Sequence, residues 1–168
     1  MSSTPPFSIR LASNSSDFFT YLSFLTKERF PTWTLYVLIM KLCDWKNFQL
    51  FIIEHEKKII GGFCITHFPI IKYKPYNWFN PQARAKVQEL RDKGYYAAAT
   101  FFIKKEFRNH GIGTTLFNEE LAKHQINIYF SSSPKARNLY LRNGARIVYE
   151  STYDIFVFDE QSRRKHNF

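Results

Sequence analysis

Arg108-Asn109-His110-Gly111-Ile112-Gly113 is the stretch of sequence that decides the fold. A strand-like run, 95–103, precedes it, and a helix-like run, 114–123, follows it. A turn of this kind leaves several backbone N–H groups unpaired at the positive end of the helix dipole. Glycine permits φ above zero and lets a ligand approach the backbone closely. The sequence therefore predicts a turn that can bind a phosphate or pyrophosphate.

Two common phosphate-binding motifs do not fit this turn. The Walker loop requires a lysine directly after its last glycine, whereas Gly113 is followed by Thr114. The dinucleotide-binding fingerprint requires a third glycine three residues further on, and that position is Leu116. Gly-x-Gly also occurs in many surface turns, so an ordinary turn is the alternative interpretation of this motif by itself.

The composition indicates one globular domain with an anionic partner. The chain has 168 residues, of which 45% are hydrophobic, and this is enough for a proper core. Its net charge of +10 favours a polyphosphate cofactor, an acidic substrate, nucleic acid or a membrane surface. Cys43 and Cys64 each lie in an apolar segment, which is typical of packed thiols in a reducing compartment.

The sequence shows no signal peptide and no membrane span. Residues 1–7 lack a basic region followed by an apolar one. The longest apolar stretch, 35–40, is far shorter than the roughly 20 residues that cross a bilayer. We therefore expect a soluble, cytoplasmic protein without a membrane partner.

Apolar residues at helical spacing predict two N-terminal helices whose stripes lie in the core. Ser16 or Asp17 would cap the first helix, and Thr32 would cap the second after Pro31. The stripes are Phe18, Tyr21, Leu22 and Leu25 in the first helix, and Leu35, Leu38, Ile39 and Leu42 in the second.

The expected fold class is α/β, with a mixed, mostly antiparallel central sheet flanked by helices in the order β-α-α-β-β-β-α-β-α-β-β. Runs 48–54 and 59–68 are expected to form an antiparallel hairpin, in which Gly61-Gly62 indicates a bulge or a close backbone approach. The other strands are expected at 7–11, 95–103, 126–130, 147–151 and 153–158, and a second helix after the turn is expected at 133–144.

Residues 1–168 are expected to form a single domain that contains one long connection and a flexible tail. The connection, 69–94, is basic and could be helical over 83–93. Its lysines could contact a substrate, or they could belong to a solvated helix face. The flexible tail is expected at 160–168.

A second motif follows the turn: Ser133-x-x-Ala136-x-x-Leu139-Tyr140-x-x-x-Gly144-Ala145. With both motifs in this order and spacing, the chain resembles the GNAT family, the Gcn5-related N-acetyltransferases. The family's first motif, Val-x-Pro-x-x-Arg/Gln-x-x-Gly-x-Gly/Ala, is matched from Ile103 to Gly113, with Lys105 in place of the proline. The second motif usually begins with asparagine, here Ser133, and ends with phenylalanine, here Ala145.

The resemblance implies that acetyl-CoA is the co-substrate and that no metal takes part. Tyr140 has the position of the general acid that protonates the leaving thiolate. The pantetheine arm would pair with the backbone of the strand end, and the pyrophosphate would lie on the turn. The implied cofactor-binding residues are Phe101, Phe102, Ile103, Arg108, Asn109, His110, Gly111, Ile112, Gly113, Thr114 and Ser133.

Basic residues flank the turn, whereas a general base is harder to find. Some family members use a glutamate at the position of Ile128. The remaining candidates are Glu54, His67 and Glu106, with a water relay as an equal alternative. The basic residues that could offset the charge of coenzyme A are Lys104, Lys105, Arg108, Lys135 and Arg137.

The resemblance implies an N-acetyltransferase that acts on a primary amine of a small molecule or peptide by direct attack on the thioester. The basic charge leaves open an amine carried on RNA, such as aminoacyl-tRNA. The absent base leaves open an inactive acyl-CoA-binding module. A homodimer is compatible with the resemblance, and the acceptor amine is not determined by the sequence.

Overall fold

A computed structural model of the chain describes residues 6–28, 31–67, 81–123, 126–129, 134–151 and 154–159. The chain divides into two compact units. Unit 1 consists of Met1–Thr66 and Ala99–Ile112, and unit 2 consists of His67–Ala98 and Gly113–Phe168. The division falls inside one strand, β4 (Tyr96–Ile103), so each unit contains part of this strand.

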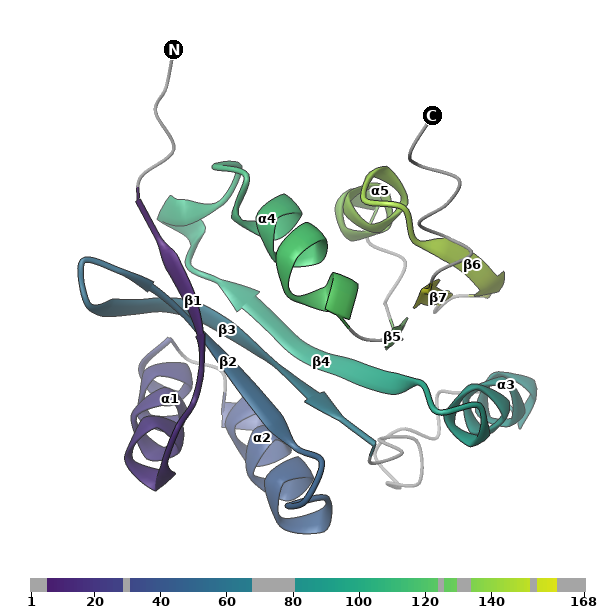
Figure 1. Cartoon of the computed structure of the whole chain (residues 1–168), viewed down its shortest axis with the longest axis horizontal. Helices are drawn as coiled ribbons and strands as arrows, with labels where there is room; N and C mark the ends of the chain where they lie inside the picture. Colours follow the sequence, from purple (N-terminus) through teal and green to yellow (C-terminus); the bar gives the residue numbers. More distant parts are fainter. Residues whose placement is uncertain are drawn as a thin grey trace. The chain divides into compact units, whose positions relative to one another are not determined.

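In unit 1 the strand order is β1-β2-β3-β4, and β1–β2 and β2–β3 are antiparallel pairs. Figure 1 shows α1 and α2 together on one side of β1–β3. The elements of unit 1 other than β4 are β1 (Ser8–Leu11), α1 (Ser15–Lys27), α2 (Pro31–Cys43), β2 (Gln49–His55), β3 (Lys58–Thr66) and the 3₁₀ helix η3 (Lys105–Phe107).

Helix α1 has the predicted core stripe but a different cap. The side chain of Asn14 accepts a hydrogen bond of 2.9 Å from the backbone N–H of Asp17. The predictions of Ser16 or Asp17 as the cap were therefore wrong, because the helix begins one turn earlier than the apolar stripe suggests. The stripe residues Phe18, Tyr21 and Leu25 are buried.

Helix α2 has a different buried face from the predicted one. It begins at Pro31, which suits the first helical position, so Thr32 lies inside the helix and is not its cap. Leu35 and Leu42 of the predicted stripe are 56% and 70% exposed. Among the α2 side chains that the structure describes, Val37 and Met40 are the fully buried ones. Since α2 is apolar on several faces, helical spacing alone could not select the face that packs.

The hairpin of β2 and β3 confirms both expectations for the glycine pair. The strands are antiparallel, and the register shifts between Ile53 and Glu54, which are paired with Gly61 and Ile59. A Cβ atom on Gly61 would collide with the backbone carbonyl of Phe102 in β4. A Cβ on Gly62 would lie 2.5 Å from the Tyr21 ring of α1.

In unit 2 the strand order is β4-β5-β7-β6. The β4–β5 pair is parallel, whereas β5–β7 and β6–β7 are antiparallel, and this confirms the predicted mixed sheet. The elements are α3 (Pro81–Asp92), α4 (Ile112–Glu119, whose first residue belongs to unit 1), the 3₁₀ helix η4 (Leu121–Lys123), β5 (Ile126–Tyr129), α5 (Pro134–Arg142), β6 (Arg146–Tyr149) and β7 (Ile155–Phe158).

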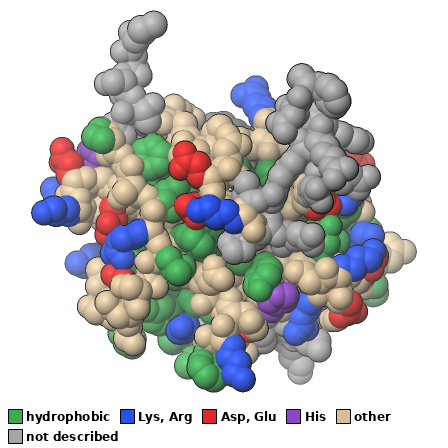
Figure 2. Space-filling view, viewed as in Figure 1, with side chains coloured by type: hydrophobic (Ala, Val, Ile, Leu, Met, Phe, Trp, Pro, Cys, Tyr) green, Lys and Arg blue, Asp and Glu red, His purple; other side chains and the backbone are tan. Residues whose placement is uncertain are grey.

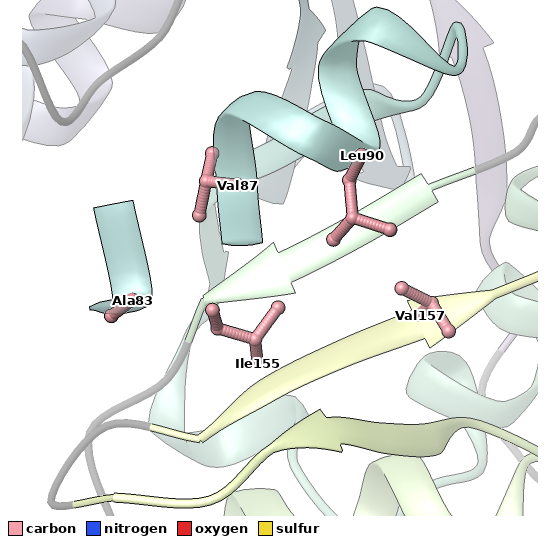
Figure 3. Close-up of a cluster of buried hydrophobic side chains, with 5 residues drawn as sticks. All are labelled: Ala83, Val87, Leu90, Ile155 and Val157. Carbon is pink, nitrogen blue, oxygen red and sulfur yellow. The ribbon is translucent and has the colours of Figure 1, made fainter. Parts of the chain in front are cut away.

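Helix α3 adds an element that the expected order leaves out, although a helix was considered for 83–93. Its buried residues Ala83, Val87 and Leu90 pack against Ile155 and Val157 of β7 (Figure 3). This contact explains why the basic segment folds as a helix in spite of its polar composition.

The opposite side of α3 carries exposed ion pairs. Hydrogen bonds from Lys93 and Lys86 lower the pKa of Glu89 to about 2. These lysines therefore belong to a solvated helix face. The predicted connection is described from residue 81 onward, whereas 68–80 and the predicted tail, 160–168, lie outside the described residues. Among the helices that the structure describes, none has the length and apolarity needed to cross a membrane.

Candidate active site

The glycine turn has the backbone conformation that its residues predict. Asn109 has φ of 66° and Gly111 has φ of 78°, both in the left-handed region. A Cβ on Gly111 would meet no atom within 4 Å. Glycine is therefore favoured at this position by its dihedral angle, and the space beside it is open.

The start of α4 carries backbone N–H groups that can bind an anion. Within the described ranges, the N–H groups of residues 111–114 donate no hydrogen bond. The first turn of α4 contains no acidic residue that would compete for them. The side chain of Ile112 is buried with Ile53, Ile60 and Ile103, so it anchors the turn and leaves only its backbone for a ligand.

Strand β4 pairs with β5 in unit 2. The parallel pairing covers Tyr96, Ala97 and Ala98, opposite Ile126, Asn127 and Ile128. Strand β4 continues to Ile103 in unit 1, where it leads into the glycine turn.

The end of β4 is held in place by contacts within unit 1. The N–H group of Lys104 donates to the carbonyl of Ile60 at 2.8 Å. The Nε–H of Arg108 donates to the carbonyl of Ile103, also at 2.8 Å, and the guanidinium lies 5.7 Å from the Phe102 ring centroid. Arg108 therefore ties the turn to the strand end in addition to any role with a ligand.

Tyr140 lies in the core of unit 2. Its side chain is 2% exposed, and its ring contacts Phe117 of α4 and Phe156 of β7 at centroid distances of 5.3 Å each. Burial raises the pKa of its hydroxyl above the usual value. The phenol is therefore protonated throughout the neutral range, as a proton donor must be.

The two sequence motifs meet inside unit 2. A Cβ on Gly113 would lie 3.4 Å from a methyl carbon of Leu139, the residue before Tyr140. The start of α4 and the middle of α5 are thus in van der Waals contact. The sequence places Leu139 in the core, but it does not reveal that Gly113 is the residue opposite it.

Two of the basic residues predicted to flank the turn form ion pairs with carboxylates. Lys104 forms an ion pair of 3.0 Å with Glu28 at the end of α1. Arg137 donates to Asp154 at 3.0 Å and to Glu150 at 3.3 Å. Both side chains therefore have carboxylate partners, and their position beside the phosphates stays a prediction. No sequence signal connects Glu28 with Lys104, because they are far apart in the chain.

The other predicted site residues are those whose exposure the structure describes and those whose side chains it does not describe. Lys105 and Arg108 are exposed beside the turn, and His110 is half-buried. Ser133 lies outside the described residues, and only the helical backbone of Lys135 is described. The role of Ser133 in cofactor binding stays a prediction.

The three candidate bases have different surroundings. Glu54 is bound by the guanidinium of Arg10 at 2.9 and 3.1 Å, so its carboxylate is already committed. Glu106 is exposed on η3. His67 is half-buried at the end of β3, and its ring lies 3.7 Å from that of Tyr96, centroid to centroid. The described part of the chain contains no group of three or more His, Cys, Asp or Glu side chains that could hold a metal ion.

The sequence model of the acetyltransferase (GNAT) domain matches residues 46–144, which is more than half of the chain. The chain belongs to the GNAT family. The match includes β4, the glycine turn and Tyr140, so the GNAT motifs and the matched region coincide. No curated protein matches the sequence.

Solved structures confirm the GNAT fold. An aminoglycoside acetyltransferase in complex with coenzyme A and kanamycin has a TM-score of 0.64 at 12% identity, with 97% of this chain and 100% of that chain covered. FeeM, an N-acyl amino acid synthase from uncultured soil microbes, has a TM-score of 0.63 at 11% identity, with 96% and 95% covered. A spermidine N-acetyltransferase from Vibrio cholerae, in complex with coenzyme A and spermine, has a TM-score of 0.53 at 16% identity, with 90% and 92% covered.

Proposed function

We propose that this chain is an N-acetyltransferase that transfers the acetyl group of acetyl-CoA to a primary amine of a small molecule or peptide. Membership of the GNAT family supports acyl transfer as the reaction class. The observation that carries the proposal is the glycine turn before α4, whose backbone N–H groups at 111–114 donate no hydrogen bond among the described residues.

In this proposal the cofactor is held largely by the backbone. The pantetheine arm would form main-chain hydrogen bonds along residues 101–103. The pyrophosphate would accept hydrogen bonds from the N–H groups of residues 109–114, at the positive end of α4. The open space beside Gly111 supports this, because no side chain there would keep a phosphate from the backbone.

The reaction is a direct displacement at the thioester carbonyl. An ammonium group has no lone pair, so the acceptor must first lose a proton to a base or to water. The amine nitrogen then forms a bond to the carbonyl carbon. The carbon–sulfur bond breaks, and its electron pair goes to the sulfur of coenzyme A. The products are an acetylated amine and, after protonation of the sulfur, free coenzyme A.

Tyr140 is proposed to supply the proton for the leaving thiolate. Its raised pKa means that the hydroxyl carries a proton at neutral pH, and its clamped ring limits the directions in which the hydroxyl can point. After each turnover the phenolate would regain a proton from the solvent or from the incoming ammonium.

Deprotonation of the amine is assigned to His67 or to a water relay. The ion pair with Arg10 disfavours Glu54, since breaking it would leave the guanidinium without one of its partners. An imidazole changes its charge near neutral pH, which suits a base that must act there. The acceptors named with the similar structures, kanamycin and spermine, bear amines, and this supports an amine as the acceptor here.

Two measurements on the full chain test this function. Isothermal titration should show saturable binding of acetyl-CoA, and no binding at millimolar cofactor would refute the proposal. Release of coenzyme A should then be followed over a panel of amines that includes aminoglycosides, polyamines and peptides. Cofactor binding without release for any amine would instead support an inactive acyl-CoA-binding module.

A further inference from the structure

Four large hydrophobic side chains are exposed at one end of unit 1. Leu11, Phe19, Leu42 and Trp45 are 52%, 63%, 70% and 67% exposed. They belong to the end of β1, the start of α1, the end of α2 and the turn before β2. These chain segments all meet at the same end of the unit (Figure 1).

The Phe48 ring connects these segments. It contacts the ring of Phe18, the neighbour of Phe19, at a centroid distance of 6.1 Å. The Lys41 ammonium, next to Leu42, lies 5.5 Å from the Phe48 ring centroid. Leu11 is paired with Phe51 near the start of β2. Leu11, Phe19, Lys41, Leu42, Trp45 and Lys46 therefore form one surface, which we call the α2-end patch.

The charge of the α2-end patch is positive toward the solvent. Lys46 is exposed, and its ammonium lies 5.6 Å from the Trp45 ring centroid. The two carboxylates nearby are engaged internally. Asp17 binds Arg10, and Asp44 accepts hydrogen bonds from Thr66 and Asn47. Figure 2 shows hydrophobic and basic side chains side by side at its lower edge, over the end of α2.

The combination of exposed apolar side chains and lysines indicates which kind of partner could cover the α2-end patch. In a symmetric pair of copies, the same positively charged surface would be contributed twice to one interface, and the lysines of the two copies would repel each other. An anionic partner has no such penalty. Tryptophan, leucine and phenylalanine beside lysine are the residues with which peripheral proteins enter the boundary of headgroups and acyl chains. Each lysine there gains from the negative surface potential.

We propose that the α2-end patch binds the surface of a membrane that contains anionic lipids. The apolar side chains enter the headgroup boundary, and Lys41 and Lys46 contact the anionic headgroups. No membrane partner was expected from the sequence, because no stretch is long enough to span a bilayer. Binding at the surface does not require a span, and the net charge of +10 favours it further.

Sedimentation of the full chain with lipid vesicles tests this inference. One set of vesicles contains phosphatidylcholine alone, and a second set contains phosphatidylglycerol in addition. We expect co-sedimentation with the second set only, weakening as salt is added. Lys46→Ala should lower the affinity about fivefold, the value of one lysine near an anionic surface. The double variant Leu42→Ala/Trp45→Ala should lower it roughly tenfold or more.

Two matched controls lie elsewhere on the same unit. Leu35→Ala removes an exposed leucine from the first half of α2, and Lys58→Ala removes an exposed lysine from the far end of the β2–β3 hairpin. Both variants should bind like the parent chain. The proposal is overturned if the parent chain does not bind the anionic vesicles, or if the controls lose as much affinity as the patch variants. Self-association in sedimentation velocity that Trp45→Ala abolishes would also overturn it, since a second copy would then be the partner.

Discussion

Gly61 of β3 lies directly against the backbone carbonyl of Phe102 in β4, with no room for a Cβ atom between them. The obstacle is backbone, which cannot rotate away as a side chain can. The same approach brings Ile60 within reach of the N–H of Lys104. The missing Cβ atom of Gly61 therefore sets the position of the end of β4, to which the cofactor is proposed to bind.

Gly61→Ala should destabilise unit 1 and disturb the strand end. We expect a loss of about 1–3 kcal/mol in the free energy of unfolding, as for other overpacked sites. Urea unfolding followed by circular dichroism measures this loss. Gly113→Ala is the control, because its Cβ would be in ordinary contact with Leu139 at 3.4–3.5 Å and should cost less than about 1 kcal/mol. Equal losses in the two variants would contradict the steric argument.

Tyr140→Phe should lower turnover while acetyl-CoA binds as before. If the hydroxyl protonates the leaving thiolate, kcat should fall roughly a hundredfold or more. The dissociation constant from isothermal titration should stay within about twofold, because a general acid interacts with the sulfur chiefly in the transition state and contributes little to binding. Tyr21→Phe, another buried tyrosine, should leave kcat unchanged. Full activity in Tyr140→Phe would remove this residue from the mechanism.

Tyr21→Phe should leave stability unchanged or increase it. The Tyr21 hydroxyl is buried and has no hydrogen-bond partner among the described residues. Removing it relieves a desolvation penalty, and we expect a gain of up to about 1 kcal/mol. Tyr95→Phe is the comparison, because its hydroxyl donates to Asp159 at 2.8 Å and its loss should cost about 1–2 kcal/mol. A Tyr21→Phe variant that unfolds as readily as Tyr95→Phe would show that the Tyr21 hydroxyl is satisfied in solution.

Asp17→Asn should remove a contribution to stability that depends on pH. Hydrogen bonds from Arg10, and then from the Ser13 backbone, lower the pKa of Asp17 below its usual 3.8. A carboxylate with a lowered pKa stabilises the fold above its unfolded pKa, and this contribution is lost as the pH falls through the folded value. The parent chain should therefore exceed the variant in stability by a constant amount from neutral pH down to about pH 4.

Below about pH 4 the two unfolding curves should converge. Chemical unfolding at a series of pH values measures both chains. Asp92→Asn is the control, since Asp92 is an exposed carboxylate that accepts a hydrogen bond of 2.8 Å from the neutral side chain of Gln88. A difference that grows as the pH falls would contradict the assignment of the Arg10 pair as its source.

Local patterns in the sequence predicted the parts of the site that local geometry determines. Gly111 and Gly144 both have a positive φ, of 78° and 86°. Their roles, in the turn and at the end of α5, could be predicted from the adjacent residues in the sequence alone. The stripe of α1 was found because Phe18, Tyr21 and Leu25 recur at helical spacing, although Phe24 outside the stripe is buried as well. The stripe of α2 was not, because Leu35 and Val37 are equally apolar and only packing decides which one is buried.

Long-range contacts set the rest of the site, and the sequence carries no signal for them. Lys104 was expected beside phosphates because it precedes the turn, yet Glu28 of a distant helix binds it. Arg137 was expected there as well, and Asp154 forms an ion pair with it at 3.0 Å. Charge is visible in a sequence, whereas the partner that neutralises it depends on the fold.

Gly61 and Gly62 are neighbours in one strand, so their missing side chains belong to opposite faces of the sheet. Both positions are closed by the backbone of a neighbouring strand. The Phe102 carbonyl of β4 blocks a Cβ on Gly61, and the Phe51 carbonyl of β2 would lie 2.7 Å from a Cβ on Gly62, where the Tyr21 ring is a second obstacle. In a library of single substitutions, both positions should therefore be depleted of every other residue. A second mutation that shrinks Tyr21 would remove only one of the two obstacles at position 62, so no side-chain replacement could reopen either position. Gly61 and Gly62 are thus each required by a different neighbouring strand, β4 for the first and β2 for the second.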